Sequence, residues 1–305
     1  MGTSAFAVPI LERLMSSNFN IVGVVCQPNR KQGRGLKIQP CAIRALAEDY
    51  NIRLLQPETL KNNEIIKQIK DLNPDLIIVA SYGLFIPQEI LKIPSRGCLN
   101  IHPSLLPHYR GPSPIQQALL NGDQETGVSL MVLDEEMDHG PLVAQHSLKI
   151  ALDDNQITLR QKLSILGADL LVQNLLPYFE GKIRPFAQDH QRASFTKLLK
   201  KLDGKVDWSR GAREIERQIR AFVGWPGSFA LWEKKRIIIL ATEVLDGDRY
   251  RENNGEVFNI NSEICVQCGQ NILKIKKLRL EGKKEVTGEE FLRGYPKIIG
   301  AVLHS

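Results

Sequence analysis

The first half of the chain alternates short apolar runs with amphipathic segments, and this alternation constrains the fold more than any other feature. The apolar runs have the length of buried strands and lie at residues 20–25, 75–80 and 98–101. The segments between them are expected to be helices, at residues 6–15, 41–49 and 64–72. Strands that alternate with helices predict an α/β fold with a doubly wound, mostly parallel sheet covered by helices on both faces.

The second half changes character at a polar, basic stretch, which we take as a linker at residues 189–205. One helix is expected after it, at 212–222, followed by short strands at 228–233, 236–242, 255–259, 264–266 and 272–280. Short strands separated by turn residues predict a small β-barrel. The expected organisation is therefore an α/β domain at 1–188 and a barrel domain at 206–305, each long enough to bury its own core.

The expected sheet lacks its first strand. A βαβ unit begins with a strand, but this chain starts at Met1 and runs at once into the turn Gly2-Thr3. In a doubly wound sheet the first strand lies in the middle, so its loss would leave backbone groups unpaired on two neighbouring strands. We therefore expect Met1 to be an internal methionine of a protein that starts several residues upstream.

The charge and the cysteines bound the partners and the compartment. A net charge of +6 and a pI near 9.0 fit an anionic partner such as nucleic acid, although many enzymes are equally basic. The odd number of cysteines predicts a reducing compartment rather than a disulfide framework; they are Cys26, Cys41, Cys98, Cys265 and Cys268. Cys265-x-x-Cys268 has no second ligand pair, so neither zinc nor redox function is expected. There is no apolar run of transmembrane length and no signal peptide.

Three polar side chains suited to acyl transfer lie at expected strand ends. Asn100 and His102 alternate on an extended segment, so both can face one side of a sheet, and Asp138 lies on a turn before a strand. An amide donates to a developing oxyanion, an imidazole carries protons, and a carboxylate orients the imidazole. An isolated Asn-x-His is more often a turn, but the proline-closed loop at 104–107 and the acid make these residues a candidate catalytic site.

The order of these motifs resembles that of the tetrahydrofolate-dependent formyltransferases. The shared residues are Asn100-x-His102, Ser104-Leu105-Leu106-Pro107, Arg110-Gly111-x-x-Pro114-Ile115, Glu125-Thr126-Gly127-Val128 and Asp138-x-Gly140. The resemblance runs through almost the whole chain and is strongest to the members that act on methionyl-tRNA. It implies a Rossmann-like formyltransferase domain followed by a C-terminal barrel of the oligonucleotide-binding (OB) type.

The resemblance also implies the reaction and its site. A formyl group would pass from 10-formyltetrahydrofolate to the α-amino group of initiator methionyl-tRNA, in support of translation initiation and without a metal. Asn100 would stabilise the oxyanion, His102 would shuttle a proton, and Asp138 would hold the useful tautomer of His102. The folate would lie against two segments and a glycine, namely Tyr82, Gly83, Leu84, Ser104, Leu105, Leu106, Pro107 and Gly140.

Two groups of cations are candidates for contact with tRNA. A basic, glycine-punctuated loop follows the first expected strand and carries Arg30, Lys31, Arg34 and Lys37. By resemblance, this loop is the insertion that enters the acceptor end of the tRNA, and Arg34 is the residue expected in direct contact. The last expected strand adds a partial stripe of cations, of which Lys274 and Lys276 share one face. Aromatic residues are sparse there, so phosphate contact is expected rather than base stacking.

Two other classes of protein remain open. One is a folate-dependent formyltransferase that acts on glycinamide ribotide or on an amino-sugar nucleotide. The first would not need a C-terminal domain, and the second shares Trp225-Pro226-Gly227 but not the basic loop. The other class is an N-terminally truncated RNA-binding paralogue with impaired catalysis, against which the complete Asn, His and Asp set argues. A bacterial-type cytoplasmic monomer is expected, with an organellar origin left open.

Overall fold

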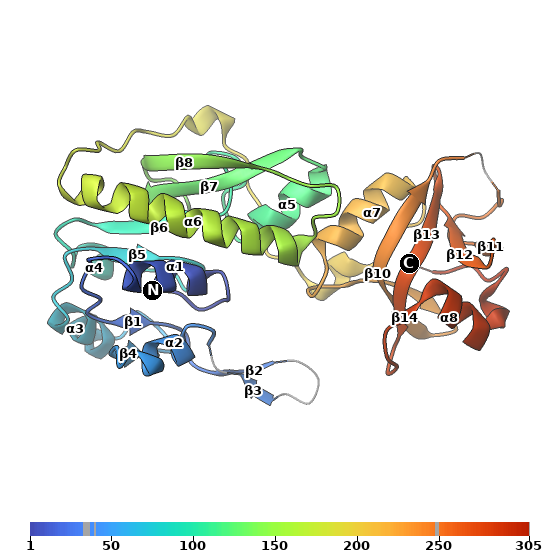
Figure 1. Ribbon diagram of the computed structural model, residues 1–305, viewed down its shortest axis with the longest axis horizontal. Helices are drawn as coiled ribbons and strands as arrows, with labels where there is room; N and C mark the ends of the chain where they lie inside the picture. Colours follow the sequence, from blue (N-terminus) through green and yellow to red (C-terminus); the bar gives the residue numbers. More distant parts are fainter. Residues whose placement is uncertain (33–36, 40, 248–249, 305) are drawn as a thin grey trace. The chain divides into compact units, whose positions relative to one another are not determined.

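A computed structural model describes residues 1–32, 37–39, 41–247 and 250–304, and only the backbone of 30–32 and 37–39 (Figure 1). The chain forms two compact units. The first consists of Met1–Pro114, Glu125–Ile150 and Arg160–Thr196, and the second of Ile115–Gln124, Ala151–Leu159 and Lys197–Ser305. Each unit therefore draws on more than one segment of the chain.

The strands of the first unit form a mixed sheet rather than the mostly parallel one expected. The parallel pairs are β1 (Val24–Val25) with β4 (Leu54–Leu55) and β5 (Ile77–Val79) with β6 (Cys98–His102). The antiparallel part continues from β6 through β7 (Glu125–Val132) to β8 (Leu142–Lys149). Only residues 133–141 separate β7 from β8, and a connection that short favours antiparallel neighbours, since a parallel crossover needs about a dozen residues or more.

Met1 and Gly2 lie between β1 and β5, at the position where a doubly wound sheet has its first strand. The amide of Gly2 donates to the carbonyl of Val25 at 3.0 Å, and the carbonyl of Met1 accepts from the amide of Ala80 at 2.9 Å. The amino group of Met1 also donates to Ile78 O at 2.6 Å. Beside these two residues lies a cavity of about 140 Å³, lined mainly by apolar side chains of the neighbouring strands and helices. Backbone pairing between the parts of the sheet that contain β1 and β5 is thus short, and it is supplemented by hydrogen bonds of Thr3 and Gln27 next to it.

Helices cover this sheet. They are α1 (Ala7–Met15), α2 (Arg44–Asp49), α3 (Asn63–Asp71), α4 (Gln88–Leu91) and α6 (Gln156–Phe179), of which residues 160–179 belong to this unit (Figure 1). Almost all of α5 (Pro114–Asn121) belongs to the second unit. The apolar side chains of α1 recur at helical spacing and are buried at Ile10, Leu11 and Leu14. A side chain on Gly167 of α6 would come within 2.8 Å of Ile101 on β6, so the glycine lets α6 pack closely on the strand that carries the candidate site.

The second unit is an antiparallel sheet with α7 (Ala212–Ala221) and α8 (Gly288–Gly294). Its strands are β9 (Ser228–Trp232), β10 (Lys235–Leu245), β11 (Val257–Ile260), β12 (Glu263–Gln267), β13 (Ile272–Leu280) and β14 (Val286–Thr287). The pairing order is β11-β12-β13-β10-β9, with β14 on β13. Its core includes Ile215 and Ile219 of α7 and Leu273 of β13. In the described part of the chain these strands form an antiparallel sheet in which the edge strands β9 and β11 do not pair directly with each other, so strand pairing alone does not close the barrel expected.

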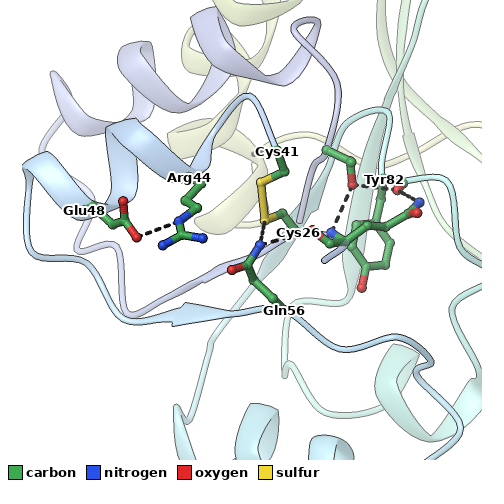
Figure 2. The surroundings of a disulfide bond; sticks show 8 residues. Cys26, Cys41, Arg44, Glu48, Gln56 and Tyr82 are labelled. Carbon is green, nitrogen blue, oxygen red and sulfur yellow. Dashed lines mark hydrogen bonds and ion pairs between the residues drawn. A yellow bond between two sulfur atoms is a disulfide. The ribbon is translucent and has the colours of Figure 1, made fainter. Parts of the chain in front are cut away.

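Cys26 and Cys41 form a disulfide, against the expectation that all five cysteines are reduced. Their sulfur atoms lie 2.26 Å apart (Figure 2). Cys26 directly follows β1, and the amide of Ala42 donates to the carbonyl of Thr3 at 3.1 Å, which brings Cys41 beside Cys26. Cysteine count alone could not reveal this return of the chain. Cys98, Cys265 and Cys268 are free and buried.

The two cysteines are 15 residues apart, so the disulfide closes a short loop in the unfolded chain. Reduction opens this loop and is expected to lower the free energy of unfolding by about 3 kcal/mol. The measurement is the urea midpoint with and without dithiothreitol. The double variant Cys26→Ala, Cys41→Ala is the control and should not respond to the reductant. Equal midpoints for the oxidised and reduced wild-type protein would contradict this expectation.

Candidate active site

The structure brings Asn100, His102 and Asp138 together. Asn100 and His102 lie two residues apart on β6 and face the same side, and Asp138 lies in the connection from β7 to β8. Nδ2 of Asn100 donates to Oδ1 of Asp138 at 3.4 Å, and the same oxygen lies 3.4 Å from Nδ1 of His102. The side chain of His102 is 5% exposed and that of Asp138 is 12% exposed. The three groups therefore form one cluster that is largely shielded from water.

The two ring nitrogens of His102 have different surroundings. Nε2 lies 3.0 Å from the carbonyl oxygen of Tyr109, which can only accept a hydrogen bond. Nε2 must therefore carry a hydrogen, and in the neutral ring Nδ1 is unprotonated and faces Asp138. Nδ1 is thus the nitrogen that can take up a proton, and Asp138 stabilises the imidazolium that forms. The tautomer is set by a backbone carbonyl that sequence reasoning missed, and not by Asp138 alone.

The carboxylate of Asp138 is held by hydrogen-bond donors on both oxygens. Oδ2 accepts from the backbone amide of Gly111 at 2.7 Å, while Oδ1 accepts from Asn100. Asp138 also has a left-handed backbone conformation, with φ at 50°. A carboxylate that is mostly buried needs such donors, because an unpaired buried charge is costly. The Gly111 amide belongs to the Arg-Gly motif, so part of that motif serves the candidate acid directly.

Hydrogen bonds from side chains of β7 and β8 hold the loop 104–107, which is predicted to contact the folate. The hydroxyl of Ser129 donates to the carbonyl of Ser104 at 2.6 Å and accepts from the amide of Leu106 at 2.9 Å. Nε2 of Gln145 donates to the carbonyl of Leu106 at 2.8 Å. The side chains of Ser104 and Leu106 are buried, whereas Leu105 and Pro107 are half-buried. Ser104 and Leu106 thus hold the loop, which leaves Leu105 and Pro107 as the candidates for ligand contact.

In the other segment predicted to contact the folate, residues 82–84, the ring of Tyr82 is buried. Tyr82 is 2% exposed and packs in the hydrophobic core, and burial raises the pKa of its phenol to about 12. Its carbonyl accepts from the side chains of Thr3 at 2.8 Å and Gln27 at 2.7 Å. Gly83 is exposed and Leu84 is half-buried. Contact with a ligand along this segment would therefore come from Gly83 and Leu84 rather than from the ring of Tyr82.

Gly140 is required by packing, and its predicted contact with a ligand stays a prediction. A Cβ atom at Gly140 would lie 1.9 Å from the carbonyl oxygen of Val132, so a larger residue cannot fit against β7. The neighbouring His139 is separate from the cluster. Its Nδ1 lies 2.7 Å from Asp134, and its ring stacks on His190 with the centroids 4.1 Å apart. His139 thus has partners of its own.

The side chains of the residues predicted to contact tRNA through the basic loop are outside what the structure describes. Arg34 lies outside the described residues. Arg30 and Lys31 belong to β2 (Arg30–Gln32) and Lys37 to β3 (Lys37–Gln39), an antiparallel pair of which only the backbone is described. Their roles stay predictions.

The predicted cations of β13 are paired with carboxylates. Lys274 lies 2.6 Å from Glu263 and 3.5 Å from Glu243, and Lys276 also lies 3.5 Å from Glu243. The hydrogen bond from Lys274 to Glu263 raises the pKa of this lysine, and the charge of Lys274 lowers the pKa of Glu243. The side chain of Lys274 is only 18% exposed, against 55% for Lys276. Lys276 is therefore the better candidate for contact with a phosphate.

Two further observations bear on the kind of site. Within the described ranges, no group of three or more His, Cys, Asp or Glu side chains could hold a metal ion. Among the helices that the structure describes, none is long and apolar enough to cross a membrane.

Comparison with known proteins identifies both parts of the chain. Residues 1–175 match the model of the Formyl transferase family, and residues 198–296 match that of the Formyl transferase C-terminal domain. The chain is 38% identical over 304 residues to the methionyl-tRNA formyltransferase of Caldanaerobacter subterraneus subsp. tengcongensis, which covers 99% of this chain and 98% of that protein. It is 40% identical over 293 residues to that of Thermodesulfovibrio yellowstonii, with 96% and 94% covered.

Solved structures support the fold. The N-formyltransferase of Helicobacter canadensis, solved with folinic acid and dTDP-3-aminofucose, gives a TM-score of 0.66 at 19% identity, over 93% of this chain and 97% of that chain. HypX of Aquifex aeolicus, solved with tetrahydrofolic acid, gives a TM-score of 0.61 at 18% identity, over 85% of this chain and 45% of that chain. The two family matches and the relatives that align over nearly their whole length show that this chain belongs to the formyltransferase family.

Proposed function

We propose that this chain transfers a formyl group from 10-formyltetrahydrofolate to the α-amino group of initiator methionyl-tRNA, and so supports translation initiation. The relatives named methionyl-tRNA formyltransferase align with almost the full length of the chain. The observation that carries the chemistry is the contact of Asn100, His102 and Asp138 at 3.4 Å in a shielded cluster. An amide donor, a protonatable ring and a carboxylate are the groups that formyl transfer needs.

Asn100 is proposed to stabilise the oxygen that becomes negative when the amine attacks the formyl carbon. Its Nδ2 has two hydrogens, one of which points to Asp138. The second is left for the substrate oxygen. Because Asn100 is half-buried at the end of a buried strand, water competes little with this hydrogen bond.

His102 and Asp138 are proposed to move the proton. The attacking amine must lose a proton, and the leaving nitrogen of the folate must gain one. The protein therefore needs only to accept the proton from the amine and pass it to the folate nitrogen. Nδ1 of His102 is unprotonated in the neutral ring and can accept the proton. Asp138, 3.4 Å away, stabilises the resulting charge until the proton is returned.

The formyl donor is proposed to lie against Leu105 and Pro107 on one side and Gly83 and Leu84 on the other. These residues present apolar side chains and backbone groups, which suit a flat heteroaromatic ring that hydrogen-bonds through its edge. The folate supplies the activated formyl group. The hydrogen bonds of Ser129 and Gln145 keep the Leu105 side of this site in one conformation.

The second unit is proposed to be a barrel of the OB type that binds tRNA. The whole chain is proposed to be a monomer in the cytoplasm. The C-terminal residues support the barrel, because they hydrogen-bond to both edge strands of the sheet. The amide of Leu231 in β9 donates to the carbonyl of His304 at 2.8 Å, and the amide of Val257 in β11 donates to that of Ala301 at 2.8 Å. Sedimentation of the free protein tests the monomer.

Formylation of charged initiator tRNA tests the function. The purified chain is incubated with 10-formyltetrahydrofolate and with methionyl-tRNA, a dTDP-amino sugar or glycinamide ribotide, and the formylated product is measured in each case. The expected result is product only with methionyl-tRNA. Turnover of another amine with no reaction of methionyl-tRNA would refute the proposal.

Salt is expected to weaken the reaction with tRNA steeply. About three phosphate contacts, at a slope of roughly 0.9 each, predict that KM for methionyl-tRNA rises about 40-fold when the salt concentration increases fourfold. Lys276→Ala should reduce that slope by about one, whereas Lys182→Ala, which changes another exposed lysine, should leave it unchanged. The KM for the folate serves as the internal control. A tRNA KM that does not depend on salt would argue against phosphate recognition.

A further inference from the structure

The segment 188–196, called here the clamp segment, pairs with the loop 107–113 of the same unit. The amide of Arg110 donates to the carbonyl of Ser194 at 2.9 Å, and the amide of Thr196 donates to the carbonyl of Arg110 at 2.7 Å. The hydroxyl of Ser194 accepts from the amide of Tyr109 at 2.9 Å. These bonds resemble those of a short parallel pair of strands, with Phe195 opposite Arg110. The clamp segment therefore fixes the backbone of this loop residue by residue.

The loop that the clamp segment holds touches two of the three candidate catalytic groups. The carbonyl of Tyr109 faces Nε2 of His102, and the amide of Gly111 donates to Oδ2 of Asp138. Tyr109 and Gly111 both have positive φ, at 62° and 104°. Glycine adopts such a conformation readily, but in Tyr109 it is kept only where the surroundings fix it. The clamp segment thus determines where the loop presents its acceptor to His102 and its donor to Asp138.

Gln188 makes the most direct connection to the candidate acid. Its side-chain Nε2 donates to the carbonyl of Asp138 at 3.0 Å and to that of Gly140 at 2.7 Å. Its Oε1 accepts from Nε and Nη2 of Arg110 at 3.2 and 2.7 Å. Gln188 is 5% exposed, so these bonds form away from water. Its amide thereby ties the turn of Asp138 to the Arg-Gly motif.

Arg110 fixes which way the amide of Gln188 points. Arg110 is 4% exposed, and its guanidinium meets Oε1 of Gln188, Nδ1 of His190 at 2.9 Å and the ring of Phe195 at 5.9 Å. A guanidinium only donates, so the oxygen of Gln188 must face Arg110 and its NH2 group must face the carbonyls of the turn. No carboxylate forms an ion pair with Arg110 in the part of the chain that is described. Its charge is met by neutral acceptors within the clamp.

We propose that Gln188 is a positioning residue that holds Asp138 in its left-handed conformation, and so sets the distance from the carboxylate to Nδ1 of His102. This proposal rests on the proposed function of the cluster. Gln188 lies between the two segments that match the formyltransferase models, residues 1–175 and 198–296. Gln188 is the last residue of the predicted α/β domain, and residues 189–196 of the clamp segment, which were predicted as linker, also support the cluster.

Two variants of Gln188 test this role. Gln188→Met keeps the length of the side chain without hydrogen bonds, and Gln188→Glu keeps the acceptor for Arg110 but removes the donor to the turn. Each is expected to lower kcat for formyl transfer about 100-fold, as misplacement of a catalytic group by about 1 Å does, with both KM values within about threefold. Gln191→Met and Gln191→Glu make the same changes at an exposed position of the clamp segment and should keep the wild-type kcat. Wild-type kcat in both Gln188 variants would overturn the proposal.

A second measurement does not depend on activity. The protonation of the His102 ring is followed by NMR across pH, with His102→Gln used to assign its signals among the six histidines. The two Gln188 variants should shift the titration midpoint of His102, and the Gln191 variants should not. If the wild-type chain formylates no amine but the midpoint shifts, the proposed function fails while the positioning role stands. An unchanged midpoint in folded Gln188 variants refutes the positioning role whether or not the enzyme is active.

Discussion

Asn100→Ala is expected to lower kcat for formyl transfer about 100- to 1,000-fold, which corresponds to the loss of roughly 2.7–4 kcal/mol of transition-state stabilisation. The side chain has one hydrogen directed at Asp138, and the other is free for the substrate oxygen. Alanine removes both. The KM for the folate should change little, because the oxygen carries its full charge only in the transition state. Steady-state kinetics with methionyl-tRNA as the acceptor measures both constants.

The matched control is Asn174→Ala. Asn174 lies on α6, where its Nδ2 donates to the carbonyl of Leu170 at 2.7 Å. Its replacement removes the same chemical group at a distance from the cluster, and kcat should remain that of the wild type. Equal kcat in Asn100→Ala and the wild type would exclude Asn100 as the oxyanion donor.

Asp138→Asn is expected to lower kcat by about 100- to 10,000-fold, the usual contribution of a proton-transfer partner. The amide has nearly the same shape as the carboxylate, and its oxygen can still accept from the Gly111 amide, whereas its NH2 group cannot accept from Asn100. It cannot carry the negative charge that stabilises protonated His102, however, and Nδ1 then no longer holds the proton from the amine. The rate is measured under single-turnover conditions, so that product release does not mask the change.

Asp134→Asn is the control for this variant. Asp134 lies in the same connection between β7 and β8, but its partner is His139 at 2.7 Å and not His102. If the charge of the connection as a whole mattered, both variants would lose activity alike. A large loss at Asp138 with none at Asp134 assigns the effect to the proposed proton transfer.

The part of the cluster that lies on a single strand could be predicted from the sequence. Alternation on a strand places Asn100 and His102 on one face whatever the rest of the fold does. Alternation says nothing about the acid, which lies in the connection after β7, the strand that pairs with β6. The mutual distances of these three groups nevertheless came only from the structure.

The supporting contacts could not be predicted, because they come from the backbone. Any residue type offers the carbonyl that fixes the tautomer of His102, so nothing at Tyr109 signals its role. The same holds for the amide of Gly111. Gln188 is an ordinary polar residue in a polar stretch, and its burial depends on the clamp segment folding back on the loop 107–113.

Long-range pairing also explains the expectations that the structure changes. The stripe of cations on β13 suggested free positive charge, but Glu243 and Glu263 come from neighbouring strands and offset it. Tyr82 follows a strand end, which suggested an open ring, yet the core encloses it. Cys26 and Cys41 looked like reduced thiols because their approach depends on the turn at Thr3. In each case the surroundings that the sequence did not reveal come from another segment of the chain.

The short pairing of Met1 and Gly2 has a consequence for the way the first unit resists opening. Across this seam the hydrogen bonds come from residues 1–3 and from the side chain of Gln27, whereas β7 and β8 pair along eight-residue strands. Val25 of β1 and Leu55 of β4 nevertheless pack in the same hydrophobic core as Val79 of β5. Resistance to opening at the seam therefore depends on buried apolar contacts as well as on a few hydrogen bonds. The β1 part of the sheet is thus expected to open together with this shared core rather than as a separate block.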